Sequence, residues 1–534
     1  MLAWWSPADH LVAPEAAPDA VIRAAEVADR VVVWASARDL PGLVARRCAP
    51  PRVLDLAECY RLLAGGWRAD PGRVWARARG LPVDAVPQAA PEDLFAALAA
   101  PQPPEDLLTG DGHLRADAAP GEWLTTPERL LRWARAAHEC AVAMWAELGD
   151  LGSRARACAI SESAAAVLCL ELERDGLPVD RPGLADLIAA HAGPRPRDAS
   201  QARAIRSERD QVVLRHAPGH ERVDLRNPLQ VKDMLTALGI AVRSTRKWEL
   251  EPFRDAHAVI PALLAWRAEE RIATTYGYHW LDTHVGPDGR LRGGWTACDG
   301  AAGRMTAQNG LHNLPAVLRP GVRAAAGHVF VRADLGQIEP RVLACVAQDP
   351  ALAAATADDD LYSPVAARLG VERPIAKVAV LAAMYGQRSG TAGAALAGLE
   401  RAYPVAMGFL DRAYEAGVAA VDLRTHGGRL IRTAGAADPG ARGRYARNAL
   451  IQGAAAELFK AWAATVRATT ADLGAQIVLC LHDELLVHVP SDAAQMCADR
   501  VEAALADAAR RWSGGAPVRF VTDTSIIERW SQAK

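Results

Sequence analysis

The sequence predicts a mixed α+β protein in which a small sheet is interrupted by long helical insertions. Short apolar runs typical of strands lie near residues 31–34, 329–331 and 477–489. Amphipathic segments of helical length fill most of the chain between them. The chain has 534 residues, enough for two to four domains, and it contains no internal repeat or heptad run.

Composition bounds the classes of protein that the chain can belong to. The net charge is −2, so any binding of nucleic acid requires positive charge gathered in one cleft. Nine cysteines form no C-x-x-C pair, which argues against a zinc site or a disulfide framework. Neither a signal peptide nor an apolar run of membrane-spanning length is present. We therefore expect a cytoplasmic protein that does not enter a membrane.

Lysine is rare in this chain. Only five of the 61 basic residues are lysine, at positions 232, 247, 377, 460 and 534. A lysine that persists among so many arginines is a candidate for a role that arginine cannot fill, such as releasing a proton.

Residues 1–155 are expected to form one region, bounded by Pro and Gly punctuation. Within it, Val31–Trp34 is apolar, Val53–Leu63 is amphipathic, and residues 125–150 are predicted to be helical. Farther along the chain, helices are predicted at 161–172, 182–192, 227–238 and 261–280. The third of these begins with Asn-Pro, a favourable helix start.

The first candidate site residue is Asp334, which follows the apolar run Val329–Val331 and precedes a helix predicted to include Val342–Ala347. A carboxylate between a strand and a helix can point into a cleft. The alternative is that Asp334 caps the helix, a common role for aspartate.

The second candidate is a predicted β-hairpin at residues 477–489. Two apolar runs flank His482-Asp483-Glu484, and this turn lacks the Asn-Gly or Gly that such turns favour. Two acids at the tip between buried strands are costly unless a cation lies there. The alternative is a solvated polar turn. If Asp334 and Asp483 converge, they offer oxygen ligands suited to Mg²⁺.

A helix predicted over residues 373–386 is the third element, with Pro374 in its first turn and Gly386 at its end. Its residues 373, 377, 381, 384 and 385 are spaced to share one face. Two cations, an apolar shelf and an aromatic ring on that face suit a triphosphate with a stacked base. The alternative is an ordinary amphipathic helix with exposed cations.

In this order, the three elements resemble the polymerase motifs of family A, the bacterial polymerase I-like DNA polymerases. Residues 334–341 (DLGQIEPR) are similar to motif A, usually D-Y-S-Q-I-E-x-R. The pattern R-x3-K-x3-L-x3-Y-G at 373–386 is similar to motif B, and His482-Asp483-Glu484 to motif C. Segments 303–315, 444–453 and 171–180 are similar to further stretches of the family, so the resemblance covers about residues 160–534.

The resemblance implies a right-hand polymerase. Its thumb would span about 175–275, its palm 276–348 and 440–534, and its fingers 349–439, all within a polymerase domain at 156–534. Residues 1–155 would be a degenerate, ribonuclease H-like 3′–5′ exonuclease domain. The implied activity is template-directed addition of deoxynucleotides to a primer by two-metal phosphoryl transfer, in replication or repair. The implied cofactors are two Mg²⁺ ions, and the partners are primer–template DNA and deoxynucleoside triphosphates, bound by a monomer.

The resemblance also implies residue roles. Asp334 and Asp483 would bind the metals, with Glu484 in support. Lys377 would act as general acid and, with Arg373, would hold the triphosphate. The other implied nucleotide-binding residues are Gln337, Glu339 (which would exclude ribonucleotides), Leu381, Tyr385 and His482. The implied DNA-binding residues are Arg304, Arg444, Asn448 and Gln452.

The sequence departs from the family in three places. Leu381 stands where motif B usually has Phe or Tyr, which predicts altered sugar discrimination, and Leu335-Gly336 replaces Tyr-Ser in motif A. The fingers look shortened before Arg373. No D-x-E occurs in the first 150 residues, so an active exonuclease is not expected. Two alternatives are a DNA-binding remnant without turnover and a metal-dependent phosphohydrolase built around His482-Asp483.

Overall fold

The computed structural model describes residues 2–6, 10–13, 19–88, 105–121, 123–300, 302–386 and 392–533. The chain divides into two compact units. Unit 1 comprises Met1–Asp175, Gly294–Ala307 and Gly327–Ile526, and unit 2 comprises Gly176–Gly293, Gln308–Ala326 and Ile527–Lys534. Both helices and strands are abundant, which confirms the mixed α+β prediction.

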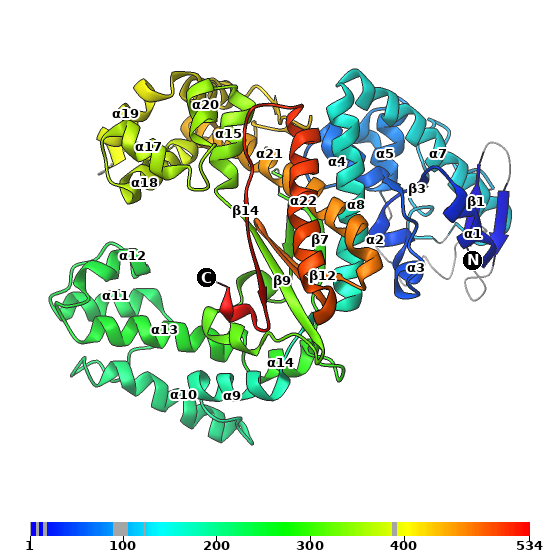
Figure 1. Ribbon diagram of the computed structural model, residues 1–534. Helices are drawn as coiled ribbons and strands as arrows, with labels where there is room; N and C mark the ends of the chain where they lie inside the picture. Colours follow the sequence, from blue (N-terminus) through cyan, green and yellow to red (C-terminus); the bar gives the residue numbers. More distant parts are fainter. Residues whose placement is uncertain are drawn as a thin grey trace. The chain divides into compact units, whose positions relative to one another are not determined.

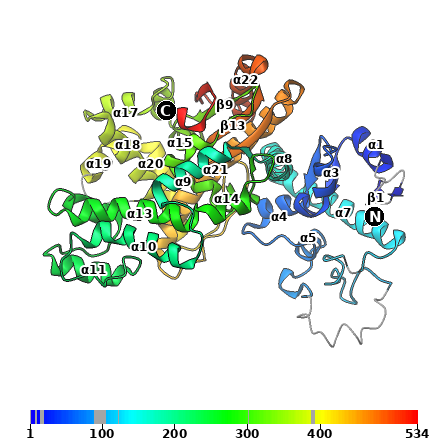
Figure 2. The ribbon, with the colours of Figure 1, turned by 90° about the horizontal axis from the view of Figure 1, so that it is seen from below.

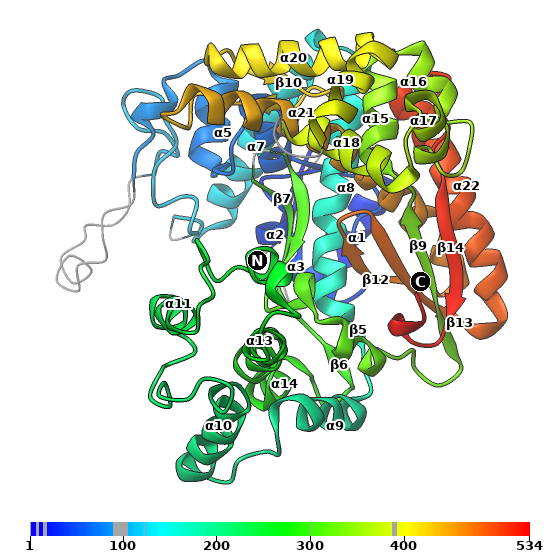
Figure 3. The ribbon, with the colours of Figure 1, turned by 90° about the vertical axis from the view of Figure 1, so that its left-hand side faces the viewer.

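Unit 1 is built on a four-stranded sheet with the strand order β12-β13-β9-β14. The strands are β9 (His328–Leu335), β12 (Gln476–Leu481), β13 (Glu484–Pro490) and β14 (Thr522–Ile527). β13 pairs antiparallel with both β12 and β9, and its residues are almost all buried. Helix α22 (Ala494–Ser513) packs against β9 and β13, beside the sheet in Figure 3. The predicted hairpin at 477–489 is thereby confirmed: it is formed by the edge strand β12 and the inner strand β13.

Helices inserted between β9 and β12 make up a second part of unit 1. The longest, α21 (Pro439–Thr470), packs along α20 (Pro404–Val418) and α22. The other elements are α15 (Ile338–Ala347), α16 (Pro350–Ala355), α17 (Tyr362–Leu369), α18 (Arg373–Tyr385), α19 (Ala392–Ala402) and the short pair β10 (Leu423–Arg424) and β11 (Leu430–Ile431). A second hairpin, β7 (Trp295–Asp299) and β8 (Arg304–Ala307), also belongs to unit 1.

The N-terminal region of unit 1 is mostly helical around a two-stranded parallel sheet, β3 (Val31–Val33) and β4 (Val53–Asp55). Figure 2 shows α4, α5 and α7 grouped around its core. The remaining elements are β1 (Leu2–Trp5), β2 (His10–Ala13), α1 (Asp19–Val27), α2 (Ser36–Asp39), α3 (Pro41–Ala45), α4 (Leu56–Ala64), α5 (Pro71–Ala78), η1 (Val83–Ala85), α7 (Pro127–Asp150) and α8 (Ser153–Asp175).

The amphipathic segment 53–63 is a strand followed by a helix, because Asp55 caps α4. One carboxylate oxygen of Asp55 accepts a hydrogen bond from the Glu58 backbone N–H at 3.0 Å. The other accepts from the Ser36 N–H at 2.6 Å. Asp55 is buried, and these bonds make it a structural residue of the N-terminal region.

Helix α8 contributes residues to the core of the N-terminal region and also packs against the four-stranded sheet through β12. Its residues Ala155, Cys158 and Ala159 belong to the cluster around Trp34 and Trp123, and its C-terminal half packs against β4 and β12. The expected domain boundary at residue 155 therefore falls inside a helix.

Unit 2 is helical, with a core that includes Val231, Leu250 and Trp266. Its elements are β5 (Leu177–Pro178), α9 (Arg181–Ala192), α10 (Ala199–Leu214), α11 (Pro228–Ala237), α12 (Lys247–Leu250), η2 (Glu251–Phe253), α13 (Val259–Thr275), α14 (Tyr278–His284), β6 (Arg290–Leu291), η3 (Leu311–Asn313), η4 (Ala316–Gly321) and η7 (Trp530–Gln532).

The prediction of a single helix at 261–280 is wrong. α13 ends at Thr275, and α14 begins at Tyr278. The Tyr276 hydroxyl donates to the Asn313 carbonyl at 2.7 Å, and its ring lies edge-on to Trp280 at 5.4 Å. These aromatic contacts stabilise a break that the apolar pattern does not reveal.

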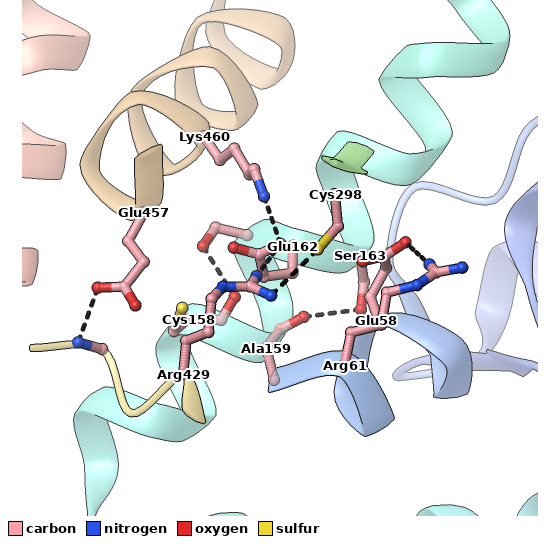
Figure 4. Close-up of polar contacts among 12 residues, drawn as sticks. Glu58, Arg61, Cys158, Ala159, Glu162, Ser163, Cys298, Arg429, Glu457 and Lys460 are labelled. Carbon is pink, nitrogen blue, oxygen red and sulfur yellow. Dashed lines mark hydrogen bonds and ion pairs between the residues drawn. The ribbon is translucent and has the colours of Figure 1, made fainter. Parts of the chain in front are cut away.

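A buried charge cluster joins the N-terminal region to α21 (Figure 4). Glu162 of α8 is fully buried and lies 2.5 Å from Lys460 Nζ and 2.7 Å from Arg429 Nη2. Burial raises the pKa of Glu162, but the two cations outweigh it and hold that pKa below its usual range. Lys460, one of the rare lysines, therefore neutralises a buried acid.

Two flanking pairs extend this cluster. Arg61 of α4 forms an ion pair with Glu58, and burial raises the pKa of Glu58 to about 7. Glu457 of α21 accepts hydrogen bonds from the Thr425 hydroxyl and, at 2.8 Å, from the Gly427 N–H. The ion pair between Lys460 and Glu162 thus joins α21 to α8, while the pair of Arg61 with Glu58 lies within α4.

Candidate active site

The sheet brings Asp334 and Asp483 to the same end of neighbouring strands. Asp334 lies opposite Glu484 in the β9–β13 register, and the Leu335 N–H donates to the Asp483 carbonyl at 2.9 Å. Burial, and next the charge of Asp483, raise the pKa of Asp334 to about 6. Burial also raises the pKa of Asp483. Two acids 149 positions apart in sequence therefore repel each other at one site.

Asp334 does not cap the following helix. The residue that precedes α15 is Gln337, in a left-handed conformation with φ of 50°. The Gln337 side-chain oxygen accepts from the Leu361 N–H at 2.9 Å, and its amide donates to Asp360 at 3.3 Å. The strand thus turns sharply into α15, and the Asp334 side chain is left partly exposed.

The turn at the hairpin tip contains two residues, His482 and Asp483, and not three. Glu484 is the first residue of β13, is only 8% exposed, and pairs with Leu481 across the hairpin. The expectation that Glu484 lies in the turn is corrected, because its backbone continues the ladder toward β9. His482 is exposed with φ of 56°, and burial, with Arg304 next, lowers its pKa.

Arg332 links the acids and was not predicted from the sequence. Its guanidinium lies 2.9 Å from Asp334, 3.3 Å from Glu484 and 3.0 Å from Asp523 of β14. The side chain is 7% exposed. Arg332 precedes Asp334 by two residues, so the alternation of a strand puts both on the same face, and that was the available signal.

A cavity of about 330 Å³ opens beside the acidic pair in unit 1. Glu339 organises its wall by accepting from Arg304 Nη2 at 2.9 Å and from the Tyr385 hydroxyl at 3.3 Å. Burial raises the pKa of Glu339 against the opposing effect of Arg304. The predicted site residues that line the cavity are Arg304, Gln337, Glu339, Leu381, Tyr385, Gln452, His482 and Asp483.

Helix α18 presents most of the face expected of it. Arg373, Lys377 and Tyr385 are exposed, and Leu381 is half-buried against the cavity. The prediction that Met384 lies on this face is wrong, because its side chain is 1% exposed and packs inward. Val378 is exposed. The helix is therefore rotated so that its last turn gives the cavity Tyr385 alone.

The arginine at the start of α18 is already paired. Arg373 Nε and Nη2 donate to the two carboxylate oxygens of Asp360, at 2.7 and 2.9 Å. The hydrogen bond from Arg373 is the largest of several effects that together lower the pKa of Asp360 to about 2. Lys377, one turn later, has no ion-pair partner among the described residues. Asp360 is a second residue that sequence reasoning missed.

The remaining predicted residues lie on α21. Gln452 reaches the cavity, while Asn448 is half-buried one turn earlier. Arg444 is exposed, 3.7 Å from Asp438, and its side chain packs against Gly386 at the end of α18. Arg444 and Asn448 are thus outside the cavity lining, on the same helix.

The carboxylates suit a hard cation. Asp334 and Asp483 provide oxygen ligands, and their raised pKa values reflect burial and repulsion that a divalent ion would relieve. Within the part of the chain that the structure describes, no group of three or more His, Cys, Asp or Glu is arranged to hold a metal. Mg²⁺ usually keeps several waters and needs only one or two carboxylates, so the donor set fits it.

Comparison with known proteins places the chain. The sequence profile of DNA polymerase family A matches residues 200–412 and 429–532, more than half of the chain. The chain belongs to DNA polymerase family A. This family A chain is 30% identical to DNA polymerase I of Deinococcus radiodurans over 297 residues, which cover 48% of this chain and 30% of that protein.

Other relatives agree. Thermostable DNA polymerase I of Thermus thermophilus is 28% identical over 326 residues, covering 55% of this chain and 38% of that protein. The family A chain thus spans about a third of the length of the curated relatives it matches. In structure it is similar to the POL domain of Pol1 from M. smegmatis, solved in complex with DNA primer-template and dNTP. The TM-score is 0.63 at 21% identity, covering 90% of this chain and 82% of that one.

No helix in the described ranges is both long and apolar enough to cross a membrane.

Proposed function

We propose that this family A chain is a DNA-directed DNA polymerase that extends a primer in replication or repair. The observation that carries the proposal is the convergence of Asp334 and Asp483 at one end of the β9–β13 pair, next to the cavity. When bound there, two Mg²⁺ ions would stabilise the attacking and leaving oxygens of an in-line phosphoryl transfer.

The side chains around the cavity would bind and orient the nucleotide. Arg373 and Lys377 would hold the triphosphate at the start of α18, and Lys377 would protonate the leaving pyrophosphate. Tyr385, fixed by its hydrogen bond to Glu339, would lie against the base pair. Glu339 would exclude a ribose 2′-hydroxyl, because its carboxylate is held in place by Arg304.

The remaining predicted residues would position nucleotide and DNA. Gln337 would shape the nucleotide site through its bonds to residues 360 and 361, and Leu381 would form its apolar shelf. Contacts to minor-groove acceptors would test pair geometry without reading sequence. The residues proposed for such contacts or for the template are Arg304, Arg444, Asn448, Gln452 and His482.

We assign the polymerase domains to the observed parts. Unit 2 would be the thumb, the four-stranded sheet with α22 the palm, and the helices from α16 to α20 the fingers. We also propose that the chain acts as a monomer in the cytoplasm.

The N-terminal region would be a degenerate exonuclease domain without nuclease activity. Asp55, its buried strand-end acid, is occupied by the backbone N–H groups of Ser36 and Glu58. Because α8 belongs to both cores, activity should be sought in the full chain. Metal-dependent shortening of a labelled 3′ end that persists in the Asp483→Ala variant would contradict this assignment.

Primer extension with Mg²⁺ and four deoxynucleotides tests the central proposal. Wild type should extend the primer, and Asp483→Ala should abolish extension while leaving primer–template binding intact. Binding without extension in wild type would instead indicate a DNA-binding remnant. Release of phosphate from a simple ester, without extension, would indicate a phosphohydrolase.

A further inference from the structure

Arg332 is one cation shared by carboxylates from three strands. Its Nη2 lies 2.9 Å from Asp334 Oδ2 on β9, its Nε 3.3 Å from Glu484 Oε1 on β13, and its Nη1 3.0 Å from Asp523 Oδ2 on β14. In the sheet β9 lies between β13 and β14, and Figure 1 shows β14 beside β9. Each nitrogen of the guanidinium therefore meets a different acid, which fixes the position of its charge.

The charge of Arg332 stays inside the site because its side chain is buried. The side chain is 7% exposed, whereas those of Asp334 and Asp523 are 32% and 72% exposed. A charge in such a place is screened by water and salt much less than a charge on the surface. Turning the guanidinium out to solvent would also break three ion pairs at once. Arg332 is therefore a resident positive charge next to Asp334.

Arg332 competes with a metal ion for the same oxygens. It occupies Oδ2 of Asp334 and one oxygen each of Glu484 and Asp523. Asp483 is not among its partners, although the Asp483 carbonyl accepts from the backbone N–H next to Asp334. A metal ion drawn to Asp334 and Asp483 would therefore meet a positive charge that is already bound to one of the two acids.

The acids of the site outnumber its cation. The acids are Asp334, Asp483, Glu484 and Asp523, and the cation is Arg332, so the net charge is −3 when all are ionised. The charges of the other four groups all act on Asp334. The neighbouring Arg304 is not counted, because it pairs with Glu339 at 2.9 Å. One divalent cation offsets most of this charge, and a second would make the site positive. Without Arg332, the four acids would match the charge of two divalent cations.

We propose that Arg332 is a positioning residue that limits these acids to one divalent cation while no nucleotide is bound. The inference rests on the metal-dependent polymerase function proposed above. Arg332 acts through the acids that it holds, and it contacts neither the nucleotide nor the primer. A second divalent cation would bind only together with a triphosphate, whose phosphates supply the negative charge that Arg332 has offset.

Electron paramagnetic resonance with Mn²⁺, which carboxylate oxygens also bind, tests the proposal directly. The full chain is titrated at pH 7.5 without nucleotide or primer, and the sharp signal of free Mn²⁺ gives the number of bound ions and their affinity. Wild type should bind one ion. Arg332→Gln should bind a second ion and hold the first about tenfold more tightly, because one positive charge is gone. Arg332→Lys keeps the charge and should behave as wild type. Unchanged number and affinity in Arg332→Gln would overturn the proposal.

A second pair of variants keeps the test decisive if Arg332→Gln alone does not fold. Asp523→Asn removes one negative charge from a largely exposed side chain and should weaken Mn²⁺ binding. The double variant Arg332→Gln with Asp523→Asn has the same net charge at the site as wild type, and it should bind one ion with an affinity within about twofold of wild type. A purely structural arginine would give no such recovery. Equal Mn²⁺ affinity in Asp523→Asn and in the double variant would overturn the proposal.

Arg519→Gln is the matched control, because it changes the net charge of the chain equally while Arg519 pairs with Asp359 at 2.7 Å. It should leave Mn²⁺ binding unchanged, and a gain equal to that of Arg332→Gln would overturn the proposal. Since no nucleotide or primer is present, a failure of primer extension would leave the Mn²⁺ results unchanged. A wild type that extends primers but binds Mn²⁺ independently of Arg332 would overturn this inference alone.

Discussion

Arg373 and Asp360 form a two-point ion pair, with Arg373 Nε and Nη2 at 2.7 and 2.9 Å from the two carboxylate oxygens. The same carboxylate accepts from Ser363 and Gln337. A triphosphate that binds Arg373 must therefore displace the Asp360 carboxylate, whose two oxygens accept from the guanidinium as two phosphate oxygens would.

Replacing Asp360 with asparagine should lower KM for deoxynucleotides by up to about fivefold, because a partly exposed pair contributes roughly 0.2–1 kcal/mol. Steady-state primer extension measures this. The control is Asp359→Asn, since Asp359 pairs with Arg519 and not with α18. A raised KM in Asp360→Asn would mean that Asp360 orients Arg373 for the nucleotide.

Arg332→Gln should destabilise the metal-free protein by about 2–3 kcal/mol, since Asp334, Glu484 and Asp523 would lose their shared cation. Mg²⁺ should then raise the melting temperature of the variant more than that of wild type, because a divalent ion offsets the same repulsion. Differential scanning fluorimetry with and without Mg²⁺ measures both. An equal Mg²⁺ shift in the two proteins would argue that the cation binds elsewhere.

Asp334→Asn should stabilise the metal-free protein at pH 7.5 by about 1–2 kcal/mol. The pKa of Asp334 is raised to about 6 in the folded state, so ionising it above that pH opposes folding. The advantage of the variant should shrink as pH falls through 6 and vanish only well below pH 4, where the wild-type side chain is protonated in both the folded and the unfolded state. Urea unfolding at several pH values checks this, and a pH-independent difference would contradict it.

Leu381→Phe should change discrimination between dideoxy- and deoxynucleotides. Leu381 lines the cavity with Tyr385 and Glu339, and an aromatic ring there would add a flat surface under the sugar. Competitive incorporation of matched nucleotides gives the ratio for each protein. The prediction fails if the ratio is the same in both, and Val378→Phe on the exposed face is the control.

Glu162→Gln should destabilise the chain by about 3–5 kcal/mol, because Lys460 and Arg429 would be left buried without their acid. Removing Lys460 as well, in Glu162→Leu with Lys460→Met, should restore part of the loss. Arg511→Gln, which breaks a surface pair with Asp507, should change stability by less than about 0.5 kcal/mol. Chemical unfolding monitored by circular dichroism distinguishes these outcomes. A loss no larger than that of Arg511→Gln would show that the cluster contributes little.

The sequence predicted the local parts of this protein well. Nearly continuous apolar runs indicated β12 and β13, and the Pro and Gly at its ends indicated α18. The order of three short motifs named Asp334, Asp483 and the residues around them, because motif spacing survives where overall identity is low. The match to the profile of DNA polymerase family A confirms the resemblance to the family that these motifs indicated.

Only the tertiary structure decided how charges pair. Arg332 meets Asp523 across 191 positions and Lys460 meets Glu162 across 298, and no local pattern encodes such distances. It also decided that Met384 packs inward while Trp248 stays exposed. The physical reason is that periodicity fixes which residues share a face of one helix or strand, whereas packing fixes what that face meets.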